Sequence, residues 1–193
     1  MANWRFLIPA VAVAMLNACA TTYQPLQVDP KTALYPTSTN VDPGGVQTFV
    51  TTTDPKSFPA VLLLSESSFR PANFSFMIRD ALAQAGITHV YTTEEFRAMA
   101  QDQKFSTADP LDSQTIKHYS ETVARVLVVS ASFTNNGDAN TLTTLSVQDG
   151  GTGQVLLKLD HTRLVWWSFD KEALYPVLNK LREWVKASTA GAA

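Results

Sequence analysis

Two short, uninterrupted apolar runs constrain the fold of this chain more than any other feature of its sequence. Residues 60–64 read Ala-Val-Leu-Leu-Leu between Pro59 and Ser65, and residues 126–129 read Val-Leu-Val-Val. A strand without polar alternation is buried on both faces, so other elements must cover both sides of the sheet that contains it. The sequence therefore predicts a layered α/β or α+β domain, in which helices pack on a central sheet.

Helical periodicity follows these runs. Apolar residues recur every three to four positions in 72–85 and again in 170–186, and Gly86 suits the left-handed residue that ends the first of these helices. Residues 92–95, Thr-Thr-Glu-Glu, fit a capping box, in which a threonine and a later glutamate satisfy each other's backbone amides. Asp109-Pro110 fits the start of another helix. We expect that helix to bury Ile116, Tyr119 and Val123.

Strand periodicity dominates the second half of the chain. Residues 141–148 and 154–165 both alternate, and the Asp-Gly-Gly-Thr-Gly sequence at 149–153 predicts a hairpin turn between them. Residues 87–91 suit a short strand, and 46–51 suit an additional edge strand that the pattern leaves open. The predicted fold is a single mixed sheet of four to five strands, with elements in the order β-α-β-α-α-β-β-β-α.

The amino terminus is typical of a signal peptide. One positive side chain, Arg5, precedes an apolar run of 11 residues, 6–16. As a helix this run would be about 16 Å long, roughly half the hydrocarbon core of a bilayer, so it is too short to span one stably. Pro9 within the run also disfavours a permanent helix. We therefore interpret residues 1–18 as a cleaved leader.

The leader ends in Leu16-Asn17-Ala18-Cys19, which contains the only cysteine of the chain. This sequence resembles the lipobox of bacterial lipoproteins, although Asn17 is less usual at its position than Ser, Thr or Ala. The resemblance implies that Leu16, Asn17 and Ala18 are recognised by the signal peptidase. It also implies that Cys19 carries a thioether-linked diacylglycerol and an amide-linked fatty acid such as palmitate. A simple secreted protein with a stray thiol is the alternative.

Two or three acyl chains would hold the protein firmly on a membrane, because each buried methylene contributes about 0.8 kcal/mol. By resemblance to Gram-negative lipoproteins, Ala20 after the cysteine allows export to the outer membrane, with the domain facing the periplasm. Residues 20–58 hold five of the ten prolines, which predicts an extended tether. The expected organisation is a signal peptide (1–18), a lipidated tether (19–58), a compact domain (59–187) and a flexible tail (188–193).

Composition excludes several classes of function. The 15 basic and 17 acidic residues give a net charge of −2 without a basic cluster, which disfavours nucleic-acid binding. One cysteine allows neither an intramolecular disulfide nor a cysteine-cluster zinc site. The histidines, His89, His118 and His161, lack metal-ligand spacing, so we predict no metal, no cofactor and no enzymatic activity.

The predicted order of elements resembles a group of envelope proteins. The group comprises the curli-secretion lipoprotein, the lipoprotein activator of penicillin-binding proteins, and the amino-terminal domain of the Tol-Pal propeller protein. The features that carry the resemblance are the strand at 60–64, the helix at 72–86, the strand at 125–130, the turn at 149–153 and the helix from Asp170. The resemblance implies a protein-binding or assembly role, and it transfers no catalytic residue.

Four aromatic or basic residues are candidates for a partner interface. Trp166 and Trp167 end a predicted strand, where neighbouring side chains point to opposite faces, so one ring would face outward. Phe69 and Arg70 follow the first buried run. Three functions remain open: a membrane-anchored binding module of the envelope, a subunit of an oligomeric outer-membrane secretion complex, and a small envelope hydrolase.

Overall fold

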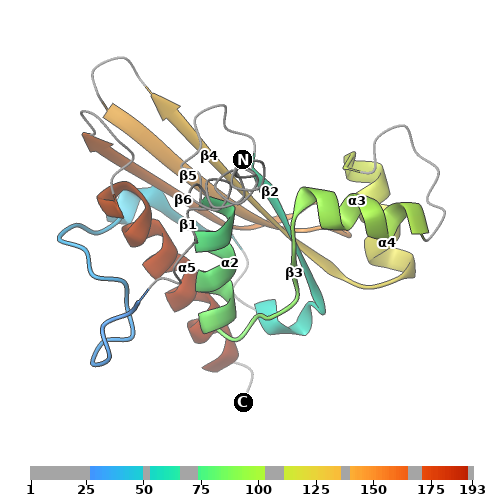
Figure 1. The fold of residues 1–193 in the computed structure, drawn as a ribbon, viewed down its shortest axis with the longest axis horizontal. Coiled ribbons are helices and arrows are strands. Elements are labelled where there is room, and N and C mark those ends of the chain that lie inside the picture. Colours follow the sequence, from blue (N-terminus) through green and yellow to red (C-terminus); the bar gives the residue numbers. More distant parts are fainter. Residues whose placement is uncertain are drawn as a thin grey trace, which may run out of the picture.

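A computed structural model describes residues 27–49, 53–65, 74–102, 111–135, 140–164 and 171–190. In this part of the chain, six strands form one mixed sheet with four α-helices packed against it (Figure 1). The strands are β1 (Val46–Thr48), β2 (Ala60–Ser65), β3 (Val90–Tyr91), β4 (Val126–Asn135), β5 (Asn140–Asp149) and β6 (Val155–Leu164). The helices are α2 (Phe74–Gln84), α3 (Thr93–Asp102), α4 (Ser113–Thr122) and α5 (Lys171–Ala190), with short 3₁₀ turns at Pro43–Gly45 and Pro55–Ser57.

The predicted order of elements is confirmed, but the predicted number of strands is too low. The strand order across the sheet is β1-β6-β5-β4-β2-β3, one strand more than the four to five expected. The additional strand is β1, which pairs antiparallel with β6 in the segment whose alternation left the prediction open. Three residues of partial alternation are too few to distinguish an edge strand from a loop by pattern alone.

The two apolar runs lie side by side at the centre of the fold. Strand β2 pairs in parallel with β4, from Ala60 opposite Val126 to Ser65 opposite Ala131. Successive side chains point to opposite faces, so Val61 and Leu63 enter one hydrophobic cluster and Leu62 enters another. Helices α2 and α5 cover the first face, while α3 and α4 cover one end of the second (Figure 1).

Helix α4 begins later than predicted. Its N-cap is Asp112, whose carboxylate accepts a 2.7 Å hydrogen bond from the Thr115 amide. The expected cap, Asp109-Pro110, lies outside the described residues. Val123, expected in the buried stripe, follows the end of the helix and has 45% of its surface exposed. The predicted stripe was one turn too long, because Ile116 and Tyr119 already complete the contact with the sheet.

Helix α5 continues through Pro176, which lacks the amide that would bond the Glu172 carbonyl in the preceding turn. A side chain from the neighbouring strand takes the place of that amide. His161 Nε2 lies 3.0 Å from the Glu172 carbonyl oxygen, and the Thr39 hydroxyl lies 3.4 Å from it. Because a carbonyl only accepts, His161 carries its hydrogen on Nε2. The Glu172 carbonyl that Pro176 leaves free therefore accepts a hydrogen bond that joins α5 to β6.

Residues 27–49 do not form the extended tether that the sequence predicted. We call residues 27–42 the strap. Two of its side chains, Tyr35 and Val41, are buried in the main hydrophobic cluster, and Val28 packs against the same cluster. The strap follows α5 on the side away from α2 before it enters β1 (Figure 1). The proline-rich composition suggested a solvated linker, whereas a few spaced apolar residues are enough to anchor irregular backbone on a helix.

Polar side chains on one stripe of α5 hold the strap. The Asn179 side chain bonds both the amide and the carbonyl of Tyr35, at 2.8 and 3.0 Å. The Glu172 carboxylate accepts hydrogen bonds from the Thr37 hydroxyl at 2.6 Å and the Ser38 amide at 3.0 Å. These bonds, with the Thr37 hydroxyl as the largest influence, lower the pKa of Glu172 from its usual 4.5.

The junction between the strap and β1 leaves no space for a side chain at Gly45. A Cβ atom there would overlap the main-chain oxygen of Asp160 on β6, while a Cβ at Gly44 would meet nothing within 4 Å. We expect Gly45→Ala to lower the free energy of unfolding by about 1–3 kcal/mol, because strand backbone cannot move aside as a side chain can. Gly44→Ala is the matched control, and urea denaturation of both variants would test the difference. Equal stabilities would contradict this packing.

Candidate protein-binding surfaces

The residues that the sequence singled out for function lie outside the described part of the chain. They are the lipobox residues Leu16, Asn17, Ala18 and Cys19 and the interface candidates Trp166, Trp167, Phe69 and Arg70. The structure neither brings them together nor separates them, so their roles stay predictions.

The three histidines do not converge. His89 is exposed in the loop before β3 and His118 is exposed on α4, whereas His161 is buried against α5. Asp160, next to His161, points to the opposite face of the sheet, where it accepts a 2.7 Å hydrogen bond from the Thr144 hydroxyl. This separation confirms that the two neighbours form no dyad. Within the described ranges, no group of three or more His, Cys, Asp or Glu side chains is placed to hold a metal ion.

An apolar groove runs along the β1 edge of the sheet, on the face that carries α5. We call it the edge groove. Its volume is about 390 Å³, and it is lined by Val46 and Thr48 of β1, Leu157 and Leu159 of β6, and Trp184 and Ala187 of α5. The groove exists because α5 packs over β5 and β6 and stops short of the edge strand. Its walls therefore come from segments about 140 residues apart in the sequence.

Charge at the edge groove is internally balanced. Lys180 and Glu183 of α5 lie on its rim and form an ion pair at 2.7 Å. Beyond β1, Phe49 has 56% of its surface exposed, and its amide bonds the Leu156 carbonyl at 3.0 Å. An apolar floor, an exposed aromatic ring and an accessible strand edge are features of surfaces that recognise proteins.

A second groove of about 360 Å³ lies on the other face, between α4 and the β5–β6 turn. Its floor includes Leu64 and Val128, and its rim carries Lys117 and Gln148. The turn beside it is the hairpin that the sequence predicted, since the Asp149 carboxylate accepts the Gly151 amide at 2.8 Å. We call this the turn groove. The polar share of its lining is about the same as in the edge groove, but none of its described lining residues is aromatic.

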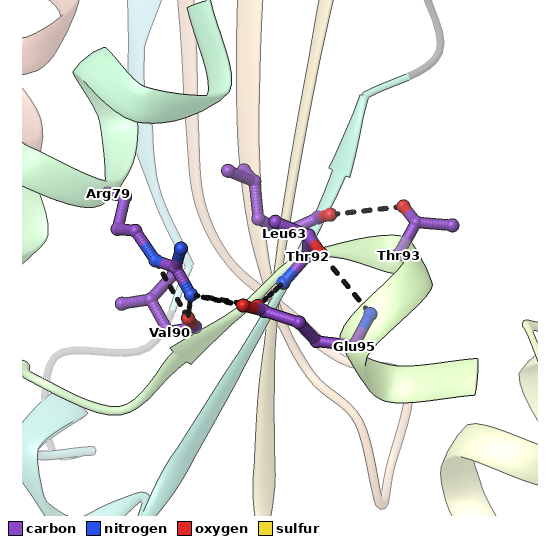
Figure 2. Close-up of polar contacts among 6 residues, drawn as sticks. All are labelled: Leu63, Arg79, Val90, Thr92, Thr93 and Glu95. Carbon is purple, nitrogen blue, oxygen red and sulfur yellow. Dashed lines mark hydrogen bonds and ion pairs between the residues drawn. The ribbon is translucent and has the colours of Figure 1, made fainter. Parts of the chain in front are cut away.

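The opposite edge of the sheet is closed by a polar cluster (Figure 2). Because the His89 carbonyl accepts the Val61 amide of β2, the next carbonyl, that of Val90, faces away from the sheet. Arg79 of α2 donates to that carbonyl through Nε at 3.0 Å and also through Nη2. The same guanidinium forms a 2.8 Å ion pair with Glu95 of α3. Strand β3 therefore offers no free acceptor at this position, unlike the edge at β1.

The cluster contains the capping box that the sequence predicted. The Thr92 amide donates to the Glu95 carboxylate at 2.7 Å, and the Glu95 amide donates to the Thr92 hydroxyl at 3.2 Å. Thr93 adds a bond to the Leu63 carbonyl of β2 at 3.4 Å. The Thr92 amide, and after it Arg79, lower the pKa of Glu95 from its usual 4.5. An ionised carboxylate paired with arginine is suited to positioning α3, not to proton transfer.

Comparison with known proteins shows no family membership. The chain matches no protein-family profile and no curated protein. Among solved structures, the C-terminal domain of LpoB from Salmonella enterica is 19% identical, over 57% of this chain and 86% of that one, with a TM-score of 0.39. The PelC dodecamer from Paraburkholderia phytofirmans is 16% identical over 74% and 94%, with a TM-score of 0.39.

The lipoprotein GNA1162 from Neisseria meningitidis is 14% identical, over 69% of this chain and 98% of that one, with a TM-score of 0.32. All of these TM-scores lie below 0.5, so none of the similarities establishes a shared function. Within the described ranges, no helix is both long enough and apolar enough to span a membrane.

Sequence patterns alone missed the edge groove. The signals that bear on it are the weak alternation of 46–51 and the place of Trp184 in the apolar stripe of α5. Neither indicates that β1 and α5 become neighbours, because that depends on β1 pairing with β6. The groove therefore depends on the strand order of the sheet, which places β1 beside β6.

Charge on Glu95 should make part of the stability depend on pH. A lowered pKa means that the carboxylate stabilises the fold above about pH 4.5, and that this contribution is lost as the pH falls through the lowered value. We expect Glu95→Gln to destabilise the protein at pH 7 by up to about 1 kcal/mol, since the pair is partly exposed. The difference from wild type should shrink near pH 3.

Glu94→Gln is the matched control for this change, because Glu94 is exposed and immediately precedes Glu95 in the first turn of α3. Urea denaturation at both pH values would measure the effect. A stability loss for Glu95→Gln that persists unchanged at pH 3 would show that packing, not charge, is responsible.

Proposed function

We propose that this chain is a lipid-anchored lipoprotein of the outer membrane, whose periplasm-facing domain binds a protein partner of the cell envelope. The edge groove carries the binding part of the proposal, since it joins an apolar floor to an open strand edge and the exposed Phe49. The lipobox-like Leu16-Asn17-Ala18-Cys19 supports the anchoring part. The role proposed for the domain is binding, without catalysis and without a cofactor.

Anchoring would place the domain close to the membrane. Residue 27 already belongs to the strap, so only seven residues, 20–26, separate Cys19 from it. The eight steps from residue 19 to residue 27 span at most about 28 Å when the chain is fully extended. A short connection of this kind raises the effective concentration of the domain for partners in the same membrane. A moderate intrinsic affinity would then be enough for stable assembly.

The anchor is tested by changing its single acceptor. We expect wild-type protein to incorporate a clickable palmitate analogue and to sediment with membranes. Cys19→Ala should incorporate none, because no other residue supplies a thiol. Ala20→Asp keeps the cysteine and is the matched control for acylation. Intact-mass spectrometry that shows wild-type protein with a free thiol or a retained Met1 would overturn the anchoring proposal.

Partner binding is tested with a photo-reactive phenylalanine analogue at Phe49. Phe76 on α2 is the matched control, because it is also exposed but lies away from the edge groove. We expect one defined cross-linked protein from position 49 and none from position 76. Thr48→Lys, which places a charge at the groove wall, should reduce that product about tenfold at equal protein level. Equal cross-linking from both positions, or no effect of Thr48→Lys, would contradict binding at the edge groove.

A further inference from the structure

The attachment of the strap differs from that of the rest of the domain. Two residues of α5, Glu172 and Asn179, hold residues 35–39 by hydrogen bonds. Backbone bonds also close a turn within the strap, such as Asp29 N to the Leu34 carbonyl at 2.8 Å, and the Asp42 carbonyl accepts the Gly45 amide of the 3₁₀ turn that follows, at 2.8 Å. Apart from these bonds, the strap is held by its own buried Tyr35 and Val41. It can therefore detach without breaking any pairing of the sheet.

Strain is present within the strap. Ala33 has a φ of 56°, in the left-handed region that residues other than glycine rarely adopt. Its amide closes the tight turn by bonding the Asp29 carbonyl at 2.7 Å. A free chain would relax this residue into an ordinary conformation. The turn therefore persists only while the surrounding contacts hold it.

A buried cation lies under the strap. Arg182 of α5 has 3% of its surface exposed, and its Nε and Nη1 atoms have no hydrogen-bond partner among the described residues. Its guanidinium lies over the Tyr35 ring, 5.0 Å from the ring centre. This cation–π contact attracts Tyr35, but a ring supplies no conventional acceptor for the buried N–H groups. A buried donor without an acceptor carries a desolvation penalty that hydration would remove. Detachment of Tyr35 would restore water to Arg182.

These three observations coincide on one segment, and we propose that the strap is a releasable store of tether length. This inference rests on the proposed membrane anchor and concerns its regulation. In the docked state, the connection from Cys19 to the domain ends at residue 27. Release of residues 27–42 would lengthen this connection by 16 residues, and a flexible chain of that length has a root-mean-square reach of about 22 Å. The domain would then reach partners farther from the membrane.

Release is measured by native-state hydrogen exchange on the full-length chain in detergent, without a partner. The amides of Tyr35 and Ser38 report on the strap, and those of β4 and β5 report on global unfolding. We expect the strap amides to exchange together and with little dependence on urea, while the β4 and β5 amides exchange only by global unfolding. Strap exchange that needs the same global unfolding as the sheet would overturn the proposal.

Variants distinguish the hydrogen bonds that hold the strap from the buried charge beneath it. Glu172→Gln weakens one clamp and should accelerate strap exchange about tenfold without changing exchange in β4. Arg182→Met keeps a long side chain beneath Tyr35 and removes the buried charge, so it should slow strap exchange, while Arg182→Lys should not. Unchanged or faster exchange in Arg182→Met would show that the guanidinium does not oppose docking. Because neither lipid labelling nor cross-linking enters this experiment, its failure would leave the proposed anchor and partner site standing.

Discussion

Parallel pairing of β2 with β4 is the interaction on which the rest of the structure depends. Both strands are apolar on both faces, so the sheet must be covered on two sides at this point. The chain meets this requirement by passing α2 across one face after β2 and α3 and α4 across the other after β3 (Figure 1). Strands β5, β6 and β1 are added outward from this pair, and the edge strand β1 has no buried residue.

Unequal cover explains where the candidate surfaces lie. Within the described ranges, the four α-helices leave parts of both faces of the sheet uncovered, so the edge groove forms where α5 ends its contact and the turn groove forms beside α4. The β3 edge is closed by Arg79, while the β1 edge carries Phe49 in an exposed position. This asymmetry between the two edges leads us to assign partner binding to β1.

Sequence-based reasoning was most accurate where the physical cause is local. The capping box at Thr92 and Glu95, the hairpin turn after Asp149 and the left-handed Gly86 follow from backbone chemistry within five residues, and the structure confirms them. It failed for the strap, whose prolines and threonines indicated a solvated tether. The hydroxyls of Thr37 and Thr39 donate to Glu172, which lies about 135 positions later in the sequence. A local sequence pattern cannot reveal a contact at that separation.

What the sequence determined by itself is the order of strands and helices, the two-sided burial of the central strands and the lipobox-like tetrapeptide, because each depends on side-chain type at short spacing. Only the tertiary structure decided that residues 27–42 pack on α5, that His161 bonds the carbonyl left free by Pro176, and that β1 and Trp184 enclose a groove. These contacts join residues that approach one another only after the sheet has formed. A local sequence pattern therefore cannot predict them.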